Sequence, residues 1–253
     1  MSRPDSALAL AMLYALQSKG ECRMGSICVE GSGLGAASFC DIVYRFYAPG
    51  PPKNANEVLP PGFAITGKPD PPMIKTALAS QYVHSVKKIS DTSQAESVIR
   101  NGVSLNAESV IILSAPATSL AKSLDITGAR DLYKERVKKL VIVDPQDSPA
   151  MRRVMNEFPA PIVIVGKDVG EALPYPATSI ANDFAWANGR HPVVDACIAN
   201  SDIPSYDMAA VLHAVRPTSS LFESPAQKDK IIATYIELAT AKPVVPVKRP
   251  KPA

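Results

Sequence analysis

The segment that most constrains the fold of this chain runs from Ser109 to Ala121. Its first part, Val110–Leu113, has four consecutive apolar residues, a composition typical of a strand buried on both faces. The small-residue turn that follows predicts a helix beginning near Thr118. In open parallel α/β sheets, ligands bind at the carboxyl ends of strands, where helix N-termini offer unpaired N–H groups. We therefore expect any functional site to include this turn.

Two later apolar runs, Leu140–Val143 and Ile162–Val165, also predict strands, and shorter strands are expected at Met24–Val29 and Gly62–Thr66. Helices are predicted between them, at Ser6–Ser18, Ala36–Tyr47, Thr92–Asn101, Ser148–Glu157, His191–Ala199 and around Met208–Leu212, whereas Tyr175–Trp186 is expected to be irregular. Strands that alternate with helices at this interval indicate an α/β fold, with a Rossmann-like, doubly wound and mostly parallel sheet flanked by helices.

Length and composition limit the classes of function. The 253 residues favour one domain over residues 1–240, followed by a tail rich in Pro and Lys at 241–253. A net charge of +3 is too small to indicate nucleic-acid binding, and no apolar run is long enough for a membrane span. Ala7–Leu16 is interpreted as a helix rather than as a signal peptide. The expected location is cytoplasmic, or exported if a leader precedes Met1.

Several enzyme classes find little support. The chain has no G-x-S-x-G motif for a serine hydrolase, and its four cysteines show no C-x-x-C spacing for zinc or redox chemistry. The three histidines, His84, His191 and His213, are expected to be structural or exposed rather than catalytic. Gly31–Gly35 follows a predicted strand, which leaves dinucleotide binding as a minor alternative, but a tight turn that needs positive φ angles explains the glycines as well.

Asp207 stands before the apolar run Met208–Leu212, at the expected N-terminus of a late helix. Helix capping is the simplest interpretation of this aspartate, with roughly even odds against a role in a site.

Several stretches together resemble the nucleoside hydrolase family, in its inosine/uridine-preferring branch. The motifs that carry the resemblance are Asp5-Ser6-Ala7-Leu8-Ala9-Leu10, Val29-Glu30-Gly31-Ser32, Ala115-Pro116-Ala117-Thr118-Ser119, Asp144-Pro145-Gln146-Asp147, Pro161–Val169 and Tyr206-Asp207. They occur in the family's order from about residue 5 to about residue 217. The resemblance implies a calcium-dependent enzyme that hydrolyses the N-glycosidic bond of ribonucleosides, and a homo-oligomer.

The resemblance also implies roles for individual residues. Thr118 and Asp207 match positions that hold calcium, and Asp5 and Ser32 match positions that contact the ribose. Oxygen ligands of this kind suit calcium because it is a hard cation. In the family the ion activates a water for attack on the anomeric carbon. No residue of this chain is assigned as the catalytic base.

The family pattern is incomplete in this chain. Ser6 replaces a metal-binding aspartate, Ser32 replaces an asparagine, and Tyr206 replaces the histidine that assists the leaving base. Aligned with the family, Met1 falls at the position of the aspartate that acts as the catalytic base, and the family's preceding strand has no counterpart in the printed sequence. Calcium is therefore expected to bind weakly at best.

Two interpretations follow from these departures. In the first, the chain keeps the fold with weak or lost activity, and it binds a nucleoside or sugar or is a structural subunit of an assembly. In the second, Asp144 or Asp147, together with Asp183 in the segment Tyr175–Trp186, supplies the metal ligands that the family motifs lack.

Overall fold

The structure is a computed structural model, and it describes residues 3–47, 61–66, 69–70, 72, 74–75, 82–197, 201–217 and 227–243. Most of the predicted tail, 244–253, lies outside the described residues. The strands are β1 (Cys28–Gly31), β2 (Gly62–Ile65), β3 (Ser93–Gln94), β4 (Ser109–Leu113), β5 (Val137–Val143) and β6 (Ile162–Val165). The longer helices are α1 (Pro4–Ser18), α2 (Gly35–Tyr47), α4 (Ala95–Ser104), α7 (Pro149–Glu157), α11 (Tyr206–Val215) and α12 (Lys228–Ala239). The shorter ones are α5 (Thr118–Ser123), α6 (Ala129–Arg136), α8 (Lys167–Ala172), α9 (Ala177–Asn182) and α10 (Pro192–Ala196), with 3₁₀ turns at Ile89–Asp91 and Ala185–Ala187.

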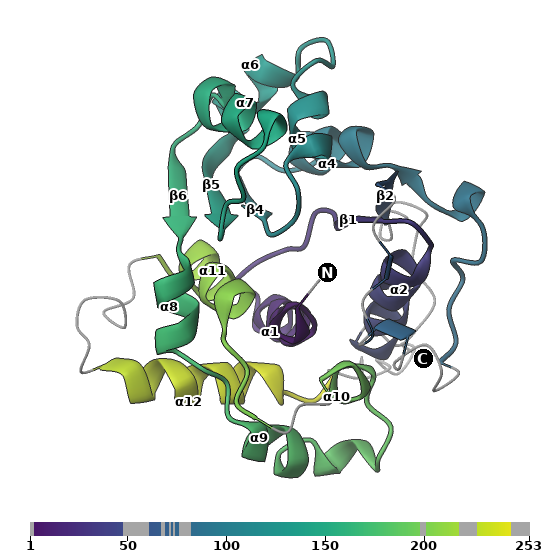
Figure 1. Cartoon of the computed structure of the whole chain (residues 1–253), viewed down its shortest axis with the longest axis vertical. Coiled ribbons are helices and arrows are strands. Elements are labelled where there is room, and N and C mark those ends of the chain that lie inside the picture. Colours follow the sequence, from purple (N-terminus) through teal and green to yellow (C-terminus); the bar gives the residue numbers. More distant parts are fainter. Residues whose placement is uncertain are drawn as a thin grey trace, which may run out of the picture.

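The strands form two parallel three-stranded sheets, in the orders β1-β2-β3 and β4-β5-β6. Helices connect successive strands and lie on both sides of the second sheet, with α5 and α7 above it and α11 below it in Figure 1. The predicted parallel α/β architecture is confirmed. Its sheet is divided between β1 and β4, which do not pair with each other among the described residues.

The alternation of side chains along β5 connects the two hydrophobic cores. Leu140 and Ile142 pack with the smaller core under α5, α6 and α7, whereas Val141 and Val143 pack with the larger core around α1. Successive residues of a strand point to opposite faces, so a continuous apolar run suits a strand that is covered on both sides. β5 is the central strand of this sheet, whereas β4, which was predicted to be buried on both faces, is half-buried except at Leu113.

Helix α1 lies at the centre of the molecule, seen end-on in Figure 1. It packs against α11, α12, α10 and α2, and Leu8, Met12 and Leu16 are fully buried. Its composition explains this position, because a helix that is apolar on all faces must be covered on all faces. Gly20, with φ of 75°, follows the C-terminus of the helix, as expected for a left-handed C-terminal residue.

Some local predictions were wrong. Tyr175–Trp186 contains the helix α9 and a 3₁₀ turn rather than irregular chain only. The helix predicted at His191–Ala199 is shorter, because His191 is its N-cap and Pro192 its first residue. None of the helices in the described ranges is long and apolar enough to cross a bilayer.

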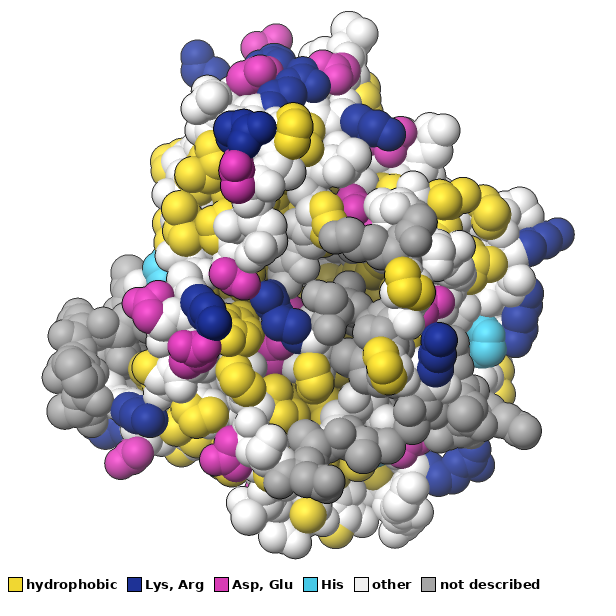
Figure 2. All heavy atoms as spheres, in the orientation of Figure 1, with side chains coloured by type: hydrophobic (Ala, Val, Ile, Leu, Met, Phe, Trp, Pro, Cys, Tyr) yellow, Lys and Arg dark blue, Asp and Glu magenta, His cyan; other side chains and the backbone are white. Residues whose placement is uncertain are grey.

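On the face of the molecule that Figure 2 shows, Lys and Arg side chains are interspersed with Asp and Glu side chains, so this face has no large patch of one charge.

Candidate functional site

A cluster of charged side chains forms where α1 and α11 begin, next to the carboxyl end of β4. Arg3 immediately precedes α1, Asp5 lies in the first turn of α1, and Asp207 lies in the first turn of α11. Acidic residues are favourable in the first turn of a helix because they face unpaired N–H groups and the positive end of the helix dipole. Packing of α1 against α11 brings the two carboxylates together.

Asp207 is 5% exposed, and both of its carboxylate oxygens have donors. Oδ1 accepts hydrogen bonds from Arg3 Nη2, at 2.8 Å, and from the Ser114 hydroxyl, while Oδ2 accepts one from the Ser6 hydroxyl. The capping interpretation of Asp207 was wrong, because Ser205 is the N-cap of α11 and the Asp207 side chain instead connects α11 to α1 and to the end of β4.

Asp5 is fully buried and lies beside Asp207. Its Oδ2 accepts a hydrogen bond from the backbone N–H of Asp207 at 2.6 Å, whereas its Oδ1 is 3.6 Å from Arg3 Nε and has no hydrogen-bond donor among the described residues. Burial, with the negative charge of Asp207, raises the pKa of Asp5 to about 7, although the Asp207 N–H and Arg3 favour the charged form. This carboxyl group therefore changes charge near neutral pH.

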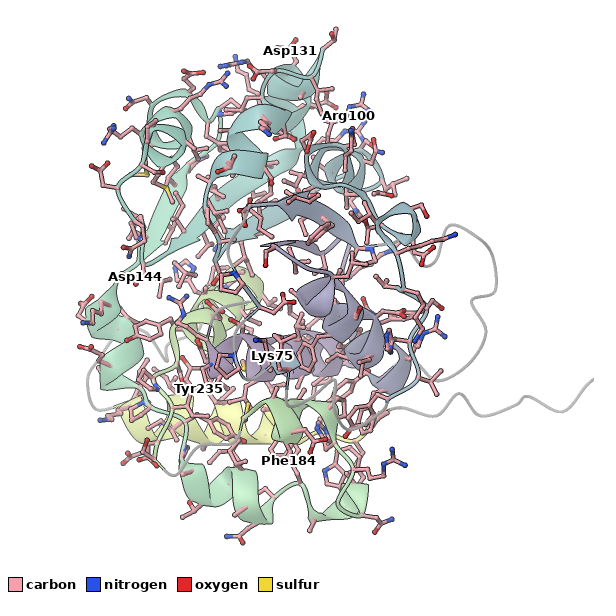
Figure 3. All side chains as sticks on the ribbon, turned by 45° about the vertical axis from the view of Figure 1, so that its right-hand side comes forward. Lys75, Arg100, Asp131, Asp144, Phe184 and Tyr235 are labelled. Atoms are coloured by element: carbon pink, nitrogen blue, oxygen red, sulfur yellow. The ribbon has the colours of Figure 1, made fainter. Side chains whose placement is uncertain are left out.

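The guanidinium of Arg3 pairs with three carboxylates in this cluster. Two of them belong to Asp207 and Asp5. The third belongs to Asp144, which follows β5 and is labelled in Figure 3, and its Oδ2 lies 3.7 Å from Arg3 Nη1. Burial alone would lower the pKa of Arg3, but the surrounding carboxylates, Asp207 first, raise it above its usual value. The guanidinium also lies 4.8 Å from the ring centroid of Tyr206. The cluster, which we call the Arg3 cluster (Arg3, Asp5, Asp144 and Asp207), is held by residues from three separate elements.

A cavity of about 190 Å³ reaches the Arg3 cluster through Ser6, Ser114 and Asp207. Glu30, at the end of β1, also lines this cavity. Its Oε1 accepts a hydrogen bond from the Ser119 hydroxyl at 2.8 Å, but its Oε2 is buried and no other part of the described chain donates to it. Sequence reasoning missed Arg3, Ser114 and Glu30, although the last two residues lie in or next to motifs that carry the family resemblance.

The glycine-rich turn after β1 surrounds a carboxylate of the same chain. The Gly35 N–H donates to Asp70 Oδ2 at 3.1 Å, and a Cβ atom at Gly31 or Gly33 would lie 3.2 Å from the Asp70 carboxylate. None of these glycines has a positive φ angle, so the turn explanation was wrong in that detail and close approach is the reason for them. Asp70 occupies the position beside the helix N-terminus that a dinucleotide phosphate would need.

The structure brings together only part of the predicted site. Asp5 and Asp207 are in contact, and Asp144, one of the alternative ligands, joins them. Thr118 is exposed as the first residue of α5, and Ser32 is exposed in the turn after β1. None of the hydrogen bonds among the described residues connects either of them to the Arg3 cluster.

The other predicted alternatives lie elsewhere. Asp147 is an exposed residue paired with Arg152, and Asp183 is exposed at the end of α9, at the bottom of Figure 1.

The described residues do not fit a calcium ion as they are placed here. Calcium needs six to eight oxygen ligands. Both Asp207 oxygens already have donors, the cation beside them is Arg3, and the described part of the chain offers no group of three or more His, Cys, Asp or Glu residues arranged for a metal. Calcium binding therefore stays a prediction, and we derive no catalytic step through it.

His191 lies in an aromatic cluster. Its ring is 2% exposed and contacts the rings of Phe46, Tyr47, Phe184 and Trp186. Nδ1 accepts hydrogen bonds from the first backbone N–H groups of α10, so Nε2 carries the proton that faces the Tyr47 hydroxyl. Burial lowers the pKa of His191 to about 4.

No family model and no curated protein sequence matches this chain. Solved structures do match it. The type III effector protein XopQ complexed with adenosine diphosphate ribose has a TM-score of 0.63 and 14% identity, over 96% of this chain and 91% of that one. An inosine-uridine preferring nucleoside hydrolase from Bacillus anthracis has a TM-score of 0.61 and 11% identity, over 94% and 96% of the two chains.

An inosine-guanosine nucleoside hydrolase matches with a TM-score of 0.64 and 12% identity, over 94% of this chain and 95% of its own. These matches extend over nearly the whole of each protein, and their identities are too low to indicate a particular enzyme type. This chain therefore has the nucleoside hydrolase fold.

Proposed function

We propose that this chain binds a ribosyl ligand, a nucleoside or a nucleotide sugar, at the Arg3 cluster and does not hydrolyse it. The observation that carries the proposal is that one guanidinium serves three carboxylates there. Negative charges outnumber positive ones there, Asp5 Oδ1 and Arg3 Nε have no hydrogen-bond partner among the described residues, and Asp144 is 32% exposed at its side chain. A ligand rich in hydroxyl groups supplies the missing donors, and the hydroxyl groups of ribose are such donors.

The position and the fold support the same ligand class. The cluster lies at the carboxyl ends of parallel strands, where α/β proteins bind ligands. Structural relatives include nucleoside hydrolases and a protein complexed with adenosine diphosphate ribose. The absence of hydrolysis follows from Arg3, which takes the place beside Asp207 that a water-activating cation would need. Homo-oligomerisation and a cytoplasmic location stay predictions.

Isothermal titration calorimetry with inosine and adenosine diphosphate ribose tests the binding. We expect a saturable signal whose affinity weakens about 12- to 160-fold in Asp144→Asn, because a hydrogen bond to a charged acceptor contributes about 1.5–3 kcal/mol. Asp147→Asn is the matched control, since Asp147 is 78% exposed and outside the cluster. Absence of binding by the native chain, or equal affinities for both variants, would refute the proposal.

A further inference from the structure

Among the described residues, hydrogen bonds hold the guanidinium of Arg3 at one corner only. Nη2 donates to Asp207 Oδ1 at 2.8 Å and to the Ser114 hydroxyl at 3.1 Å. Nε lies 3.6 Å from Asp5 Oδ1 and Nη1 lies 3.7 Å from Asp144 Oδ2, which are distances of ion pairs rather than of hydrogen bonds. Hydrogen bonds at a single nitrogen leave the plane of the guanidinium free to tilt, so its orientation depends on a further contact.

The aromatic ring of Tyr206 makes that contact. Arg3 Cζ lies over the ring, 4.8 Å from its centroid, within the range of a cation–π interaction. The negative face of the ring attracts the cation, and planar guanidinium groups stack on such faces. Tyr206 is the first residue of α11, and none of the hydrogen bonds among the described residues involves its hydroxyl. The ring, rather than the hydroxyl, therefore acts on Arg3.

The place of the Tyr206 ring is set by α8. The ring packs against the backbone of Gly170, where an added Cβ atom would lie 2.2 Å from Cδ1 of the ring. The Ser205 N–H donates to the Gly170 carbonyl oxygen at 2.9 Å, which joins the start of α11 to α8. Gly170 is buried and its φ angle is not positive, so close approach is the reason for this glycine. A larger residue at 170 would displace the ring.

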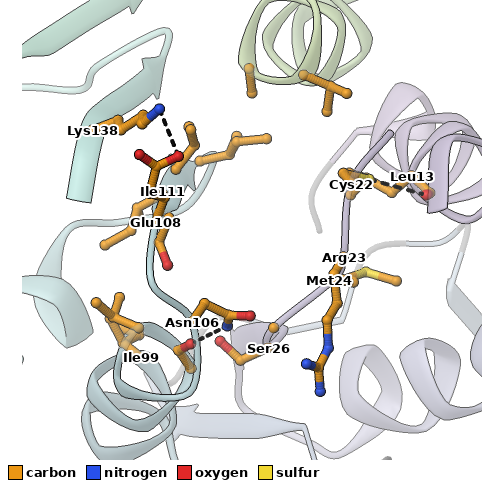
Figure 4. A pocket seen from close by; sticks show the side chains of 18 of the residues that line it. Leu13, Cys22, Arg23, Met24, Ser26, Ile99, Asn106, Glu108, Ile111 and Lys138 are labelled. Atoms are coloured by element: carbon orange, nitrogen blue, oxygen red, sulfur yellow. Dashed lines mark hydrogen bonds and ion pairs between the residues drawn. The ribbon is translucent and has the colours of Figure 1, made fainter. Parts of the chain in front are cut away.

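This arrangement is separate from the larger cavity of the molecule, shown in Figure 4. That cavity has a volume of about 430 Å³ and is lined by Lys138 and its ion-pair partner Glu108, but not by Arg3, Tyr206 or Gly170. A ligand bound in that cavity would not respond to changes of the Tyr206 ring.

We propose that the ring of Tyr206 orients the Arg3 guanidinium and that Gly170 fixes the ring. In this orientation Nη2 binds Asp207, and Nη1 lies beside Asp144 with N–H groups available to a ligand. A hydroxyl group of the ligand can then accept a hydrogen bond from Nη1 and donate one to Asp144. The effect on binding rests on the proposed ribosyl ligand, whereas the contact itself is tested in the ligand-free protein.

NMR of the ligand-free chain, with arginine labelled by ¹³C and ¹⁵N in the guanidinium, tests the contact. The Arg3 signal is assigned by its loss in Arg3→Lys. We expect a ring-current shift of this signal in the native chain and in Tyr206→Phe, and its loss in Tyr206→Leu, which keeps an apolar side chain without an aromatic face. Tyr82→Leu is the matched control, because Arg190 lies 5.8 Å from the Tyr82 ring centroid, outside the Arg3 cluster, and it should leave the Arg3 signal unchanged.

Calorimetry with inosine measures the consequence for binding. Affinity should fall about 2- to 30-fold in Tyr206→Leu, the range that cation–π contributions span, and Tyr206→Phe should restore it. Gly170→Ala should also weaken binding, because the new Cβ atom displaces the ring. In the Tyr206→Ala background Gly170→Ala should have no further effect, since no ring remains to be displaced.

Several results would overturn the proposal. One is an Arg3 signal that is the same in Tyr206→Leu and in the native chain. Another is a loss of affinity in Tyr206→Phe as large as in Tyr206→Leu, which would mean that the hydroxyl binds the ligand. A third is binding that responds to Lys138→Ala and not to Tyr206→Leu, which would place the ligand in the cavity of Figure 4. If the native chain binds no inosine, the proposed function fails, and the NMR result still decides whether Tyr206 orients Arg3.

Discussion

Replacing Arg3 with Ala tests whether its guanidinium stabilises the buried carboxylates. The Arg3 side chain is 26% exposed and that of Asp207 only 6%. Removing one partner of a fully buried ion pair costs about 3–5 kcal/mol, and an exposed pair contributes at most about 1 kcal/mol. The partial exposure of Arg3 places the expected loss at about 2–3 kcal/mol. Arg152→Ala is the matched control, because its ion pair with Asp147 is highly exposed, and it should cost less than about 1 kcal/mol.

Urea denaturation at pH 8 measures both losses, and Arg3→Lys keeps a folded sample if Arg3→Ala is too unstable. Calcium adds a second readout, because Arg3→Ala leaves Asp207 and Asp5 without their cation. Millimolar calcium should raise the melting temperature of Arg3→Ala and leave that of the native chain unchanged. Equal losses for Arg3→Ala and Arg152→Ala, or equal calcium effects on the native chain and the variant, would refute the reasoning.

Three further outcomes follow from buried groups. The pKa of Asp5 is raised to about 7 in the folded state, so the folded protein holds a proton that the unfolded chain releases near pH 4. Asp5 therefore lowers the unfolding free energy as pH rises from about 4 to 7. In urea denaturation, the unfolding free energy of Asp5→Asn minus that of the native chain should increase between about pH 5 and pH 8. His191, with its pKa lowered to about 4, should stay neutral with Nε2 protonated at pH 5.5 in nitrogen NMR spectra, and a charged ring there would contradict its burial. The Tyr235 hydroxyl is buried with no partner in the part of the chain that the structure describes, whereas that of Tyr175 pairs with Ser179 at 2.8 Å. Tyr235→Phe should therefore keep or raise the unfolding free energy, while Tyr175→Phe lowers it by about 1 kcal/mol. A larger loss for Tyr235→Phe than for Tyr175→Phe would contradict this reasoning.

The fold was predictable because the chain repeats a strong local pattern. Apolar runs such as Leu140–Val143 alternate with helix-forming segments, and only a parallel sheet covered on both faces buries such runs. The division of the sheet could not be predicted from the sequence pattern. The apolar run Val110–Leu113 has the composition of a strand that is paired on both edges. Whether a strand pairs with its second edge depends on its neighbours in space, and among the described strands only β5 pairs with β4.

The candidate site was predicted in part. Asp5 and Asp207 were found through motif resemblance, and they do meet, because α1 and α11 pack together. Arg3 was missed since a single arginine near the start of a chain carries no local pattern, and its role depends on Asp144 and Asp207, which come from distant segments, as well as on Asp5. Asp70 was missed for the same reason, because only the folded turn brings it to Gly35.

Ribose release from inosine, uridine and adenosine, measured as reducing sugar with and without calcium, tests the central claim most directly. The native chain is compared with Asp207→Asn, which removes the charge that Arg3 neutralises. The account predicts no release above the protein-free control for either protein, while the native chain still binds a ribosyl ligand in calorimetry. Calcium-dependent release by the native chain that disappears in Asp207→Asn would contradict it, because Asp207 would then hold a catalytic metal rather than Arg3.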